Sequence, residues 1–229
     1  MLDVIVDLNL TDKNIIVVGA GREGVKRIST LIKHGSKIIV ISEDVDKSIF
    51  EIEGGKYPLI IFRRKIHDAN FLNEFKDTFM VVAATNNLSL NKMIISKSKE
   101  SHVLTYGLDS TTSQLGDLSF ASFINIEESI QIAVSTFGKS PLMSKIIRMK
   151  IEKYLKNIIG QEDILNIKIQ EFARDRAKKV IKNQNERKRF LYGLFYDQEI
   201  QELITKKNID KVKELIINTL DKWEGNNIR

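Results

Sequence analysis

Three glycines follow a short apolar run near the start of the chain, in the stretch IIVVGAGREG at residues 15–24. In the spacing Gly19-x-Gly21-x-x-Gly24, the first glycine permits a tight turn after a strand and the second lets a pyrophosphate approach the backbone. The third lets the following helix pack closely, and the free N–H groups at the N-terminus of that helix favour an anion. The pattern predicts a dinucleotide site, and a tight turn without a ligand is the alternative.

Two acidic residues and a polar cluster follow later apolar runs. Glu43 and Asp44 come just after the run at 37–41, with Ser42 expected at the end of that strand. Carboxylates at this point suit ribose hydroxyls and favour NAD over NADP. The segment AATNN at 83–87 ends another run, so its Thr and Asn are expected either to line the cofactor crevice or to cap the next helix.

No catalytic motif of hydrolases or metalloenzymes is present by spacing. The chain has no cysteine and only three scattered histidines, so we expect no thiolate chemistry and no resident metal site. The remaining candidate is Asp109, which follows the apolar run at 103–106 and is expected at the same sheet edge as the glycines. A carboxylate there could act as a general base beside a hydride transfer, and a loop-capping aspartate is the alternative.

The elements that must position these residues alternate between apolar runs and helical patterns. Buried strands are predicted at Ile15–Gly19, Lys37–Ile41, Leu59–Phe62, Phe79–Ala84 and Val103–Tyr106. Helices are predicted between them at Glu23–His34, Val45–Glu53, Ala69–Phe75 and Leu88–Lys99. Such alternation indicates right-handed crossovers and a parallel sheet, with an additional edge strand predicted at Val4–Leu8.

The pattern changes after residue 106. Strands predicted at 118–124 and 130–136 have no helix between them, which indicates an antiparallel pair. Ser140 and Pro141 then begin a helical region that reaches Trp223. The predicted fold class is α/β: a Rossmann-like parallel sheet with a short antiparallel β extension and a C-terminal α-helical domain. The expected domains are an NAD-binding domain at 1–116, a β extension and dimerisation segment at 117–140, and a basic helical domain at 141–229.

Net charge differs between the N-terminal and C-terminal parts of this 229-residue chain. Residues 1–140 carry a net charge of −1, and residues 141–229 carry +7. The excess suggests a polyanionic partner, with a solvated lysine-rich surface as the alternative. No apolar run approaches the roughly 18 residues of a membrane span, and the N-terminus does not resemble a signal peptide. We therefore expect no membrane partner and a cytoplasmic location, which the absence of cysteine also suits.

Taken together, these motifs resemble the siroheme synthase N-terminal family. The glycine turn, AATNN, an Asp after the fifth strand and the run AVSTFGKSP at 133–141 carry the resemblance, which extends from about residue 4 to residue 155. The resemblance implies NAD-dependent dehydrogenation of precorrin-2 to sirohydrochlorin, an oxidoreductase step of siroheme and tetrapyrrole biosynthesis. It also implies a homodimer, and in some members a ferrochelatase (lyase) activity that takes ferrous iron as a second substrate.

The resemblance also implies roles for individual residues. The pyrophosphate turn is assigned to Gly19, Gly21, Arg22, Glu23 and Gly24, the two riboses to Glu43, Asp44, Thr85 and Asn86, and catalysis to Asp109. The tetrapyrrole is assigned to Thr136, Lys139, Ser140, Lys145 and Arg148. The carboxylates of precorrin-2 suit the basic C-terminal region.

The sequence departs from the family around the candidate catalytic residue. Tyr106 stands where the family usually has Asn, and Phe123 stands where it commonly has Pro. These departures surround Asp109, so the sequence supports the chelatase activity less well than the dehydrogenation. The alternative to an enzyme is a protein that binds NAD(H) without turnover, either as a regulatory sensor or as a DNA-binding protein that places its basic helices on nucleic acid. The enzyme hypothesis predicts no nucleic-acid partner.

Overall fold

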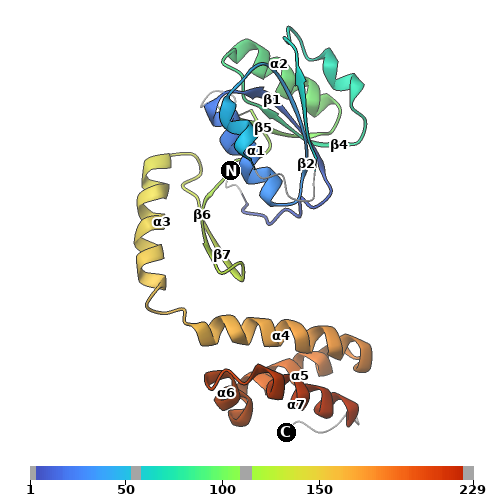
Figure 1. The fold of residues 1–229 in the computed structure, drawn as a ribbon, viewed down its shortest axis with the longest axis vertical. Coiled ribbons are helices and arrows are strands. Elements are labelled where there is room, and N and C mark those ends of the chain that lie inside the picture. Colours follow the sequence, from blue (N-terminus) through green and yellow to red (C-terminus); the bar gives the residue numbers. More distant parts are fainter. Residues whose placement is uncertain (1–3, 53–57, 109–114, 224–229) are drawn as a thin grey trace. The chain divides into compact units, whose positions relative to one another are not determined.

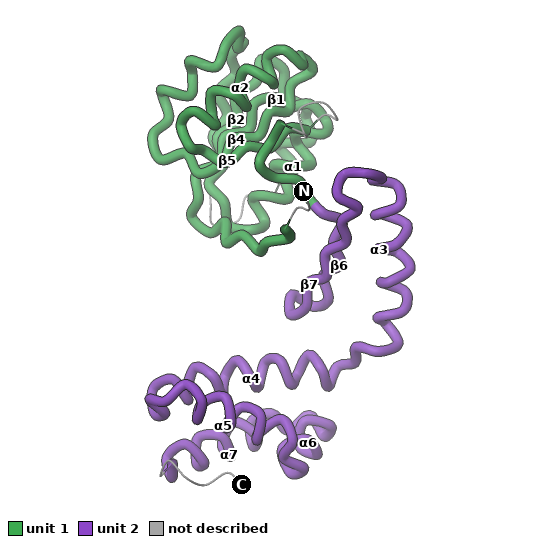
Figure 2. The backbone as a smooth tube through the Cα atoms, turned by 180° about the vertical axis from the view of Figure 1, so that it is seen from behind, with its two compact units in different colours: residues 1–120 green, residues 121–229 purple. Residues whose placement is uncertain are grey.

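A computed structural model describes residues 4–52, 58–108 and 115–223 of the chain. The chain divides into two compact units, residues 1–120 and 121–229, which Figure 2 colours separately. The β hairpin that follows the main sheet belongs to the same unit as the C-terminal helices. The finer division predicted at residues 116 and 140 stays a prediction.

A parallel five-stranded sheet forms the centre of the first unit, in the order β3-β2-β1-β4-β5. Its strands are β1 (Asn14–Ala20), β2 (Lys37–Val45), β3 (Leu59–Arg63), β4 (Thr78–Ala83) and β5 (Leu104–Gly107). The predicted Rossmann-like parallel sheet is therefore confirmed. β2 runs on past Ile41 to Val45, because Val45 pairs with Ala20 after a register shift in which β2 holds the extra residues.

Two long helices cover the two faces of this sheet (Figure 1). α1 (Arg22–Lys33) packs on one face, and α2 (Leu88–Glu100) packs on the other. The first core joins α1 to alternate strand residues, namely Val25, Ile28 and Leu31 with Ile15, Val17 and Val40. The second core joins α2 to the intervening ones, namely Leu90, Ile94 and Ile95 with Ile16, Val18 and Val81. Burial on both faces explains why the strands are nearly continuous apolar runs.

Two of the four predicted helices in this unit are wrong. The segments expected at 45–53 and 69–75 form short 3₁₀ helices, η1 (Lys47–Glu51) and η2 (Asn70–Glu74). Each buries a single side chain, Ile49 in η1 and Phe71 in η2. One apolar anchor is too little to stabilise a full amphipathic helix, so each segment closes with i→i+3 bonds instead.

The predicted edge strand at Val4–Leu8 is also wrong. None of these residues is assigned to a strand, and the side chains of Val4, Ile5 and Val6 are exposed. The edges of the sheet are β3 and β5, and within the described part of the chain neither pairs with this segment. An isolated β-branched run without a pairing partner cannot satisfy its backbone groups as a strand.

The second unit begins with an antiparallel hairpin. β6 (Ser122–Ile126) pairs with β7 (Ile130–Val134) across a turn at Glu127 and Glu128, whose φ values are 47° and 55°. The predicted β extension is confirmed, but its first strand starts later than residue 118. Leu118 and Phe120 instead pack against the core of the first unit.

Helices make up the rest of the second unit. They are α3 (Pro141–Leu155), α4 (Gln161–Val180), α5 (Gln184–Tyr196), α6 (Gln198–Thr205) and α7 (Ile209–Asp221). Helices α4 to α7 share one apolar core around Phe190, Ala173 and Ile216. Of all described helices, none has both the length and the apolar character needed to cross a membrane.

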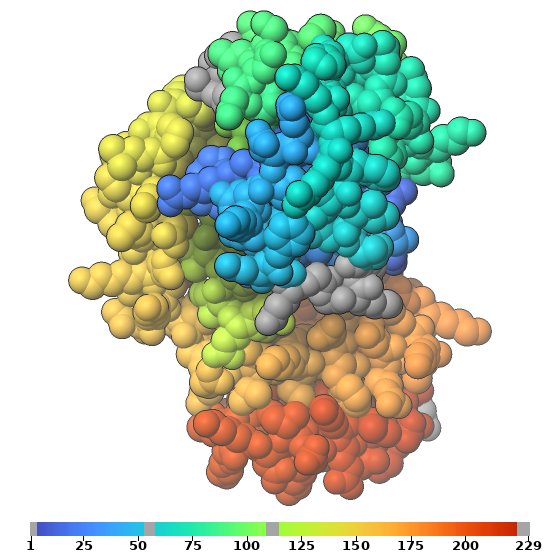
Figure 3. Space-filling view, turned by 45° about the horizontal axis from the view of Figure 1, so that its top comes forward, coloured from blue at the N-terminus to red at the C-terminus, as the bar shows by residue number. Residues whose placement is uncertain are grey.

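Helix α3 differs from the helices that follow it. Ser140 caps its N-terminus by accepting a hydrogen bond from the Met143 N–H at 3.1 Å, and Pro141 occupies its first turn, as predicted. Within α3 only Ser144 is buried, and the helix packs against the β6–β7 hairpin. Much of its apolar surface is therefore open, and the helix is the long yellow ridge of Figure 3.

Candidate active site

The predicted cofactor residues gather where the strand order of the parallel sheet reverses. β1 and β4 are neighbours at the centre, and the connections from them lead to opposite sides of the sheet (Figure 1). Ligands of such sheets bind outside the carboxyl ends of the strands at this switch point. The end of β1 leads into the turn at residues 19–24, and the end of β4 leads into residues 84–87.

Gly19 and Gly24 allow these two strand ends to meet closely. Gly19 has a φ of +99°, and a Cβ added to it would lie 2.5 Å from the Ala84 carbonyl oxygen. A Cβ added to Gly24 would overlap the carbonyl oxygen of Gly19. Packing therefore excludes larger residues at both positions, and backbone conformation also excludes them at Gly19, whether or not a ligand is bound.

Gly21 differs, because the described residues leave space beside it. A Cβ added to Gly21 has no heavy atom within 4 Å. Gly21 is the N-cap of α1 and supplies no side-chain capping bond, and its carbonyl accepts the first helical hydrogen bond from Val25 N–H at 2.9 Å. The earlier N–H groups of α1 lack partners within the helix, so this position fits the close approach of a pyrophosphate.

The charges beside the turn are suited to an anion. Arg22 is exposed at the first position of α1, and Glu23 pairs with Lys26 at 2.5 Å. The hydrogen bond from Lys26 lowers the pKa of Glu23 below its usual value, so the carboxylate is ionised and locally balanced. Arg22 is therefore the cation available to a phosphate at this turn.

The end of β2 fastens the glycine turn as well as presenting acids. The Ser42 hydroxyl accepts a hydrogen bond from Ala20 N–H at 3.0 Å and donates one to the Asp44 carbonyl at 2.5 Å. The prediction that Ser42 ends its strand is therefore wrong. Ser42 lies within β2, and its hydroxyl joins β2 to the end of β1. Glu43 and Asp44 are exposed beyond it, and Glu43 lies 3.7 Å from Lys65.

The segment after β4 has a mainly structural hydrogen-bond network. The Thr85 hydroxyl donates to Asn91 Oδ1 at 2.7 Å and accepts from Asn87 N–H at 3.1 Å. Asn87 accepts from Leu90 N–H at 3.1 Å and so caps α2, which confirms the capping reading of this segment. Thr85 lies beside the glycine turn, since its backbone nitrogen is 2.8 Å from the position of a Cβ on Gly19. Asn86 is exposed.

The candidate catalytic residue follows β5 but lies outside the described residues. Leu108 N–H donates to the Ala83 carbonyl at 3.1 Å, so the chain is still beside β4 one residue before Asp109. Tyr106 is buried in the core on the α1 face, and its hydroxyl accepts a hydrogen bond from Arg27 at 3.0 Å. The Arg27 guanidinium also lies 4.0 Å from the centre of the Phe120 ring. The tyrosine that departs from the family pattern therefore has a packing role.

Sequence reasoning missed one carboxylate on the far side of that segment. Asp117 accepts two hydrogen bonds from Thr105 in the middle of β5 and pairs with Lys99 of α2. The spacing of Asp117 from other polar residues in the sequence does not predict this role. Its partners Thr105 and Lys99 come within reach only because the chain returns to β5.

The residues assigned to the tetrapyrrole lie in the second unit. The Thr136 hydroxyl donates to the Ser140 carbonyl, accepts from Ser140 N–H, both at 3.1 Å, and meets the Ser144 hydroxyl at 2.9 Å. These bonds build the turn before α3. Lys139 and Lys145 are exposed. Arg148 pairs with Glu152 of the same helix at 2.6 Å.

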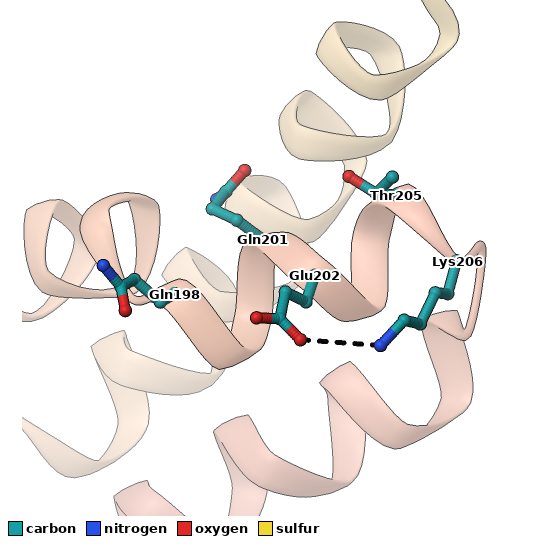
Figure 4. A pocket seen from close by; sticks show the side chains of 5 residues that line it. All are labelled: Gln198, Gln201, Glu202, Thr205 and Lys206. Carbon is teal, nitrogen blue, oxygen red and sulfur yellow. Dashed lines mark hydrogen bonds and ion pairs between the residues drawn. The ribbon is translucent and has the colours of Figure 1, made fainter.

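No other feature of the described residues competes for the chemistry. The depression on α6 in Figure 4 is lined by Gln198, Gln201, Glu202, Thr205 and Lys206, with Glu202 and Lys206 paired at 3.5 Å. These residues come from one helix and its C-cap, and the two charged side chains among them face each other. Among the described residues no group of three or more histidine, aspartate or glutamate side chains is placed to hold a metal ion.

Comparison with known families agrees with this geometry. A family described as "Putative NAD(P)-binding" matches residues 6–122, and a second, "Sirohaem biosynthesis protein central", matches residues 128–154. The chain belongs to the siroheme synthase N-terminal family. Its cofactor is accordingly a nicotinamide dinucleotide.

Individual relatives and one solved structure are similar to most of this chain. It is 30% identical to a "Siroheme synthase" of Buchnera aphidicola over 96% of this chain and 43% of that protein. It is 26% identical to a "Putative precorrin-2 dehydrogenase" of Methanocaldococcus jannaschii over 96% of this chain and 97% of that one. The solved structure of "SirC, precorrin-2 dehydrogenase" shares the fold with a TM-score of 0.65 at 19% identity, covering 96% of this chain and all of that one. The chain spans less than half the length of the siroheme synthases it matches.

Proposed function

We propose that this chain oxidises precorrin-2 to sirohydrochlorin with NAD⁺. The observation that carries the proposal is the glycine turn: Gly19 and Gly24 are required by packing, whereas Gly21 leaves open space at the N-terminus of α1. The M. jannaschii relative that matches along almost its whole length is named for this reaction. When bound, the nicotinamide accepts a hydride, so the substrate loses a hydride and one proton.

The cofactor would be held by residues at the carboxyl ends of β1, β2 and β4. We assign the pyrophosphate to Gly21, the first N–H groups of α1 and Arg22. Two exposed carboxylates, Glu43 and Asp44, suit the ribose hydroxyls and favour NAD over the 2′-phosphate of NADP. Asn86 is the exposed polar side chain after β4. Thr85 supports the wall of the crevice through its bonds to Asn87 and Asn91.

The substrate side requires cations and one base. Lys139 and Lys145 are exposed and suit the carboxylates of the tetrapyrrole, with Arg148 further along α3. We assign proton removal to the Asp109 carboxylate, because the chain leaves β5 beside the end of β4. The protein then contributes orientation, charge complementarity and a proton acceptor.

A homodimer in the cytoplasm is part of the same proposal. Exposed apolar side chains along α3, including Leu142, Met143 and Met149, support an interface there. A chain without cysteine suits a reducing compartment. Ferrous iron as a second substrate is a separate question, which the same assay addresses.

The test is an anaerobic assay of the purified protein with precorrin-2 and NAD⁺, following NADH formation. We expect turnover in the wild type and a loss of about 10²-fold or more in Asp109→Asn, the range for removing a general base. NADH binding should be retained in that variant. Adding ferrous iron and following siroheme formation measures chelation independently.

A matched control is Asp12→Asn, which also removes one carboxylate. Asp12 is exposed with a φ of 62°, a conformation that Asn tolerates, and it pairs only peripherally with Lys37 at 3.3 Å. Equal turnover in Asp109→Asn and the wild type would remove Asp109 from the mechanism. Nucleotide binding without any turnover, together with salt-sensitive binding to DNA, would favour the sensing alternative.

A further inference from the structure

The end of β3 carries three consecutive cations next to the acids at the end of β2. Arg63, Arg64 and Lys65 follow the apolar residues of β3, and Ser42 of β2 is the register partner of Arg63. The pairing continues one residue further, because Arg64 N–H donates to the Ser42 carbonyl at 3.1 Å. The cations and the acids that follow Ser42 therefore lie side by side at the carboxyl edge of the sheet.

Arg64 is engaged on the α2 side of the sheet, away from the glycine turn. Its guanidinium pairs with Glu74 of η2 at 2.9 Å, and η2 packs into the same core as α2. Ile66, two residues later, packs into that core as well. Side chains alternate between the two sides of an extended chain, so Arg63 and Lys65 lie on the α1 side.

The contacts of Arg63 and Lys65 agree with this placement. The Arg63 guanidinium lies 5.8 Å from the centre of the Phe50 ring in η1, and η1 contributes to the core that contains α1. Lys65 Nζ lies 3.7 Å from Glu43 Oε2, and both of these side chains are largely exposed. The α1 side is also the side of Gly21, to which the pyrophosphate is assigned.

We propose that Glu43 and Lys65 together determine which nicotinamide dinucleotide binds, and that Lys65 is the binding group for a 2′-phosphate. A carboxylate accepts a hydrogen bond from the 2′-hydroxyl of NAD and repels the 2′-phosphate of NADP, whereas a cation binds that phosphate. Here the repelling carboxylate is paired with the cation, so Glu43 masks Lys65. Arg63 adds a second positive charge on the same side. This inference rests on the proposed function, in which Glu43 lies at the ribose.

The test measures the Kd of NADH and NADPH by titration calorimetry of the full chain at one fixed ionic strength. Glu43→Gln removes the charge and releases Lys65, so the Kd of NADPH should fall about tenfold, the value of one hydrogen bond to a charged group. The Kd of NADH should rise by no more than about fivefold, because an amide oxygen still accepts from the 2′-hydroxyl. Lys65→Gln alone should weaken NADPH about fivefold and leave NADH within about twofold of the wild type.

A double variant asks whether Lys65 is the group that meets the phosphate. In Glu43→Gln with Lys65→Gln, the gain for NADPH should disappear, leaving its Kd within about twofold of the wild type. An unchanged Kd of NADPH in Glu43→Gln would overturn the inference. A gain that survives in the double variant would overturn it as well, because the phosphate would then be bound by another group.

Lys37→Gln is the matched control. Lys37 begins β2, at the opposite edge of the sheet, and it also pairs with an exposed carboxylate, that of Asp12 at 3.3 Å. The substitution removes the same charge from the same unit, so both Kd values should stay within about twofold of the wild type. A loss of NADPH affinity equal to that in Lys65→Gln would attribute the effect to net charge and would overturn the inference.

The titrations contain no precorrin-2, which separates this inference from the proposed function. A chain that shows the expected changes in Kd but does not oxidise precorrin-2 would keep the roles of Glu43 and Lys65 and reject the proposed reaction. Turnover of precorrin-2 by a chain whose Glu43→Gln variant gains no affinity for NADPH would keep the reaction and reject those roles.

Discussion

Two segments leave the sheet at its carboxyl edge and are held in opposite ways. After β1, the chain is positioned by the absence of side chains, since Gly19 and Gly24 let two backbones come together. After β5, the chain is positioned by the presence of one, since Asp117 joins the returning backbone to Thr105. Both devices hold a backbone segment against the sheet, but only the first is visible as a short motif.

The difference shows what each device can provide. A glycine turn leaves space, and that space can admit a phosphate to bare N–H groups. The Asp117 carboxylate instead occupies the space itself and accepts hydrogen bonds from Thr105. Such an arrangement suits the support of neighbouring residues and leaves no room for a ligand. The comparison predicts that substitutions in the first segment act through sterics, and those in the second through hydrogen bonding and pH.

The largest expected effect is that of Gly19→Ala on stability. An alanine there would have a φ of +99° and a Cβ 2.5 Å from the Ala84 oxygen. Strain and overpacking each cost roughly 1–3 kcal/mol, so the free energy of unfolding should fall by about 3 kcal/mol or more in urea denaturation.

Gly138→Ala is the matched control for that experiment. Gly138 has a φ of +72°, but a Cβ there meets nothing within 4 Å, so only the backbone strain applies. We expect a cost of about 1–2 kcal/mol. If the two variants were equally stable, the contact between the glycine turn and the end of β4 would not be as tight as described.

A smaller and different effect is expected from Gly21→Ala. Its φ of −70° suits alanine and a Cβ there has no heavy atom within 4 Å beyond its chain neighbours, so the free energy of unfolding should fall by no more than about 1 kcal/mol, the cost of alanine at an N-cap. The methyl group would occupy the space assigned to the pyrophosphate, and the Kd for NADH should rise about tenfold, or about 1.4 kcal/mol. Titration calorimetry measures this directly. An unchanged Kd would place the pyrophosphate elsewhere.

The sequence was a good guide to the parts of this fold that depend on local patterns. β-branched runs predicted all five parallel strands, because burial on both faces demands continuous apolar residues. The spacing of Gly19, Gly21 and Gly24 predicted a turn of the right kind, and the structure assigns each glycine a distinct steric surrounding. Ser140 and Pro141 likewise predicted the start of α3.

Hydrogen-bond partners were not predictable in the same way. The hydroxyl of Ser42 binds a backbone 22 residues away, and Asp117 binds one 12 residues away, so each pair exists only after the strands have aligned. The segments at 45–53 and 69–75 have enough apolar residues to suggest helices, but the 3₁₀ helices that form there, η1 and η2, each bury only one side chain. Whether a short apolar segment becomes α or 3₁₀ is decided by the surface it meets.

The smallest expected effect concerns Asp117 and acid. Its folded-state pKa lies below the ordinary value of 3.8, so its ionised form stabilises the fold above that pH, and this contribution is lost as the pH falls through the folded-state pKa. Asp117→Asn removes the titration and the Lys99 pair but keeps an acceptor for Thr105. We therefore expect the wild type to be more stable than Asp117→Asn by about 0.5 kcal/mol near neutral pH, because the pair is partly exposed.

That stability gap should be constant down to about pH 5 and should narrow below the ordinary pKa of aspartate. Urea denaturation at a series of pH values measures it, and Lys99→Ala should reduce the gap by removing one of the causes of the lowered pKa. A gap that widened on acidification would mean that Asp117 binds a proton more readily in the folded chain than in the unfolded one. The bonds between Asp117 and Thr105 would then depend on a neutral carboxyl group. The segment after β5 would no longer differ from the glycine turn in being held by a charge.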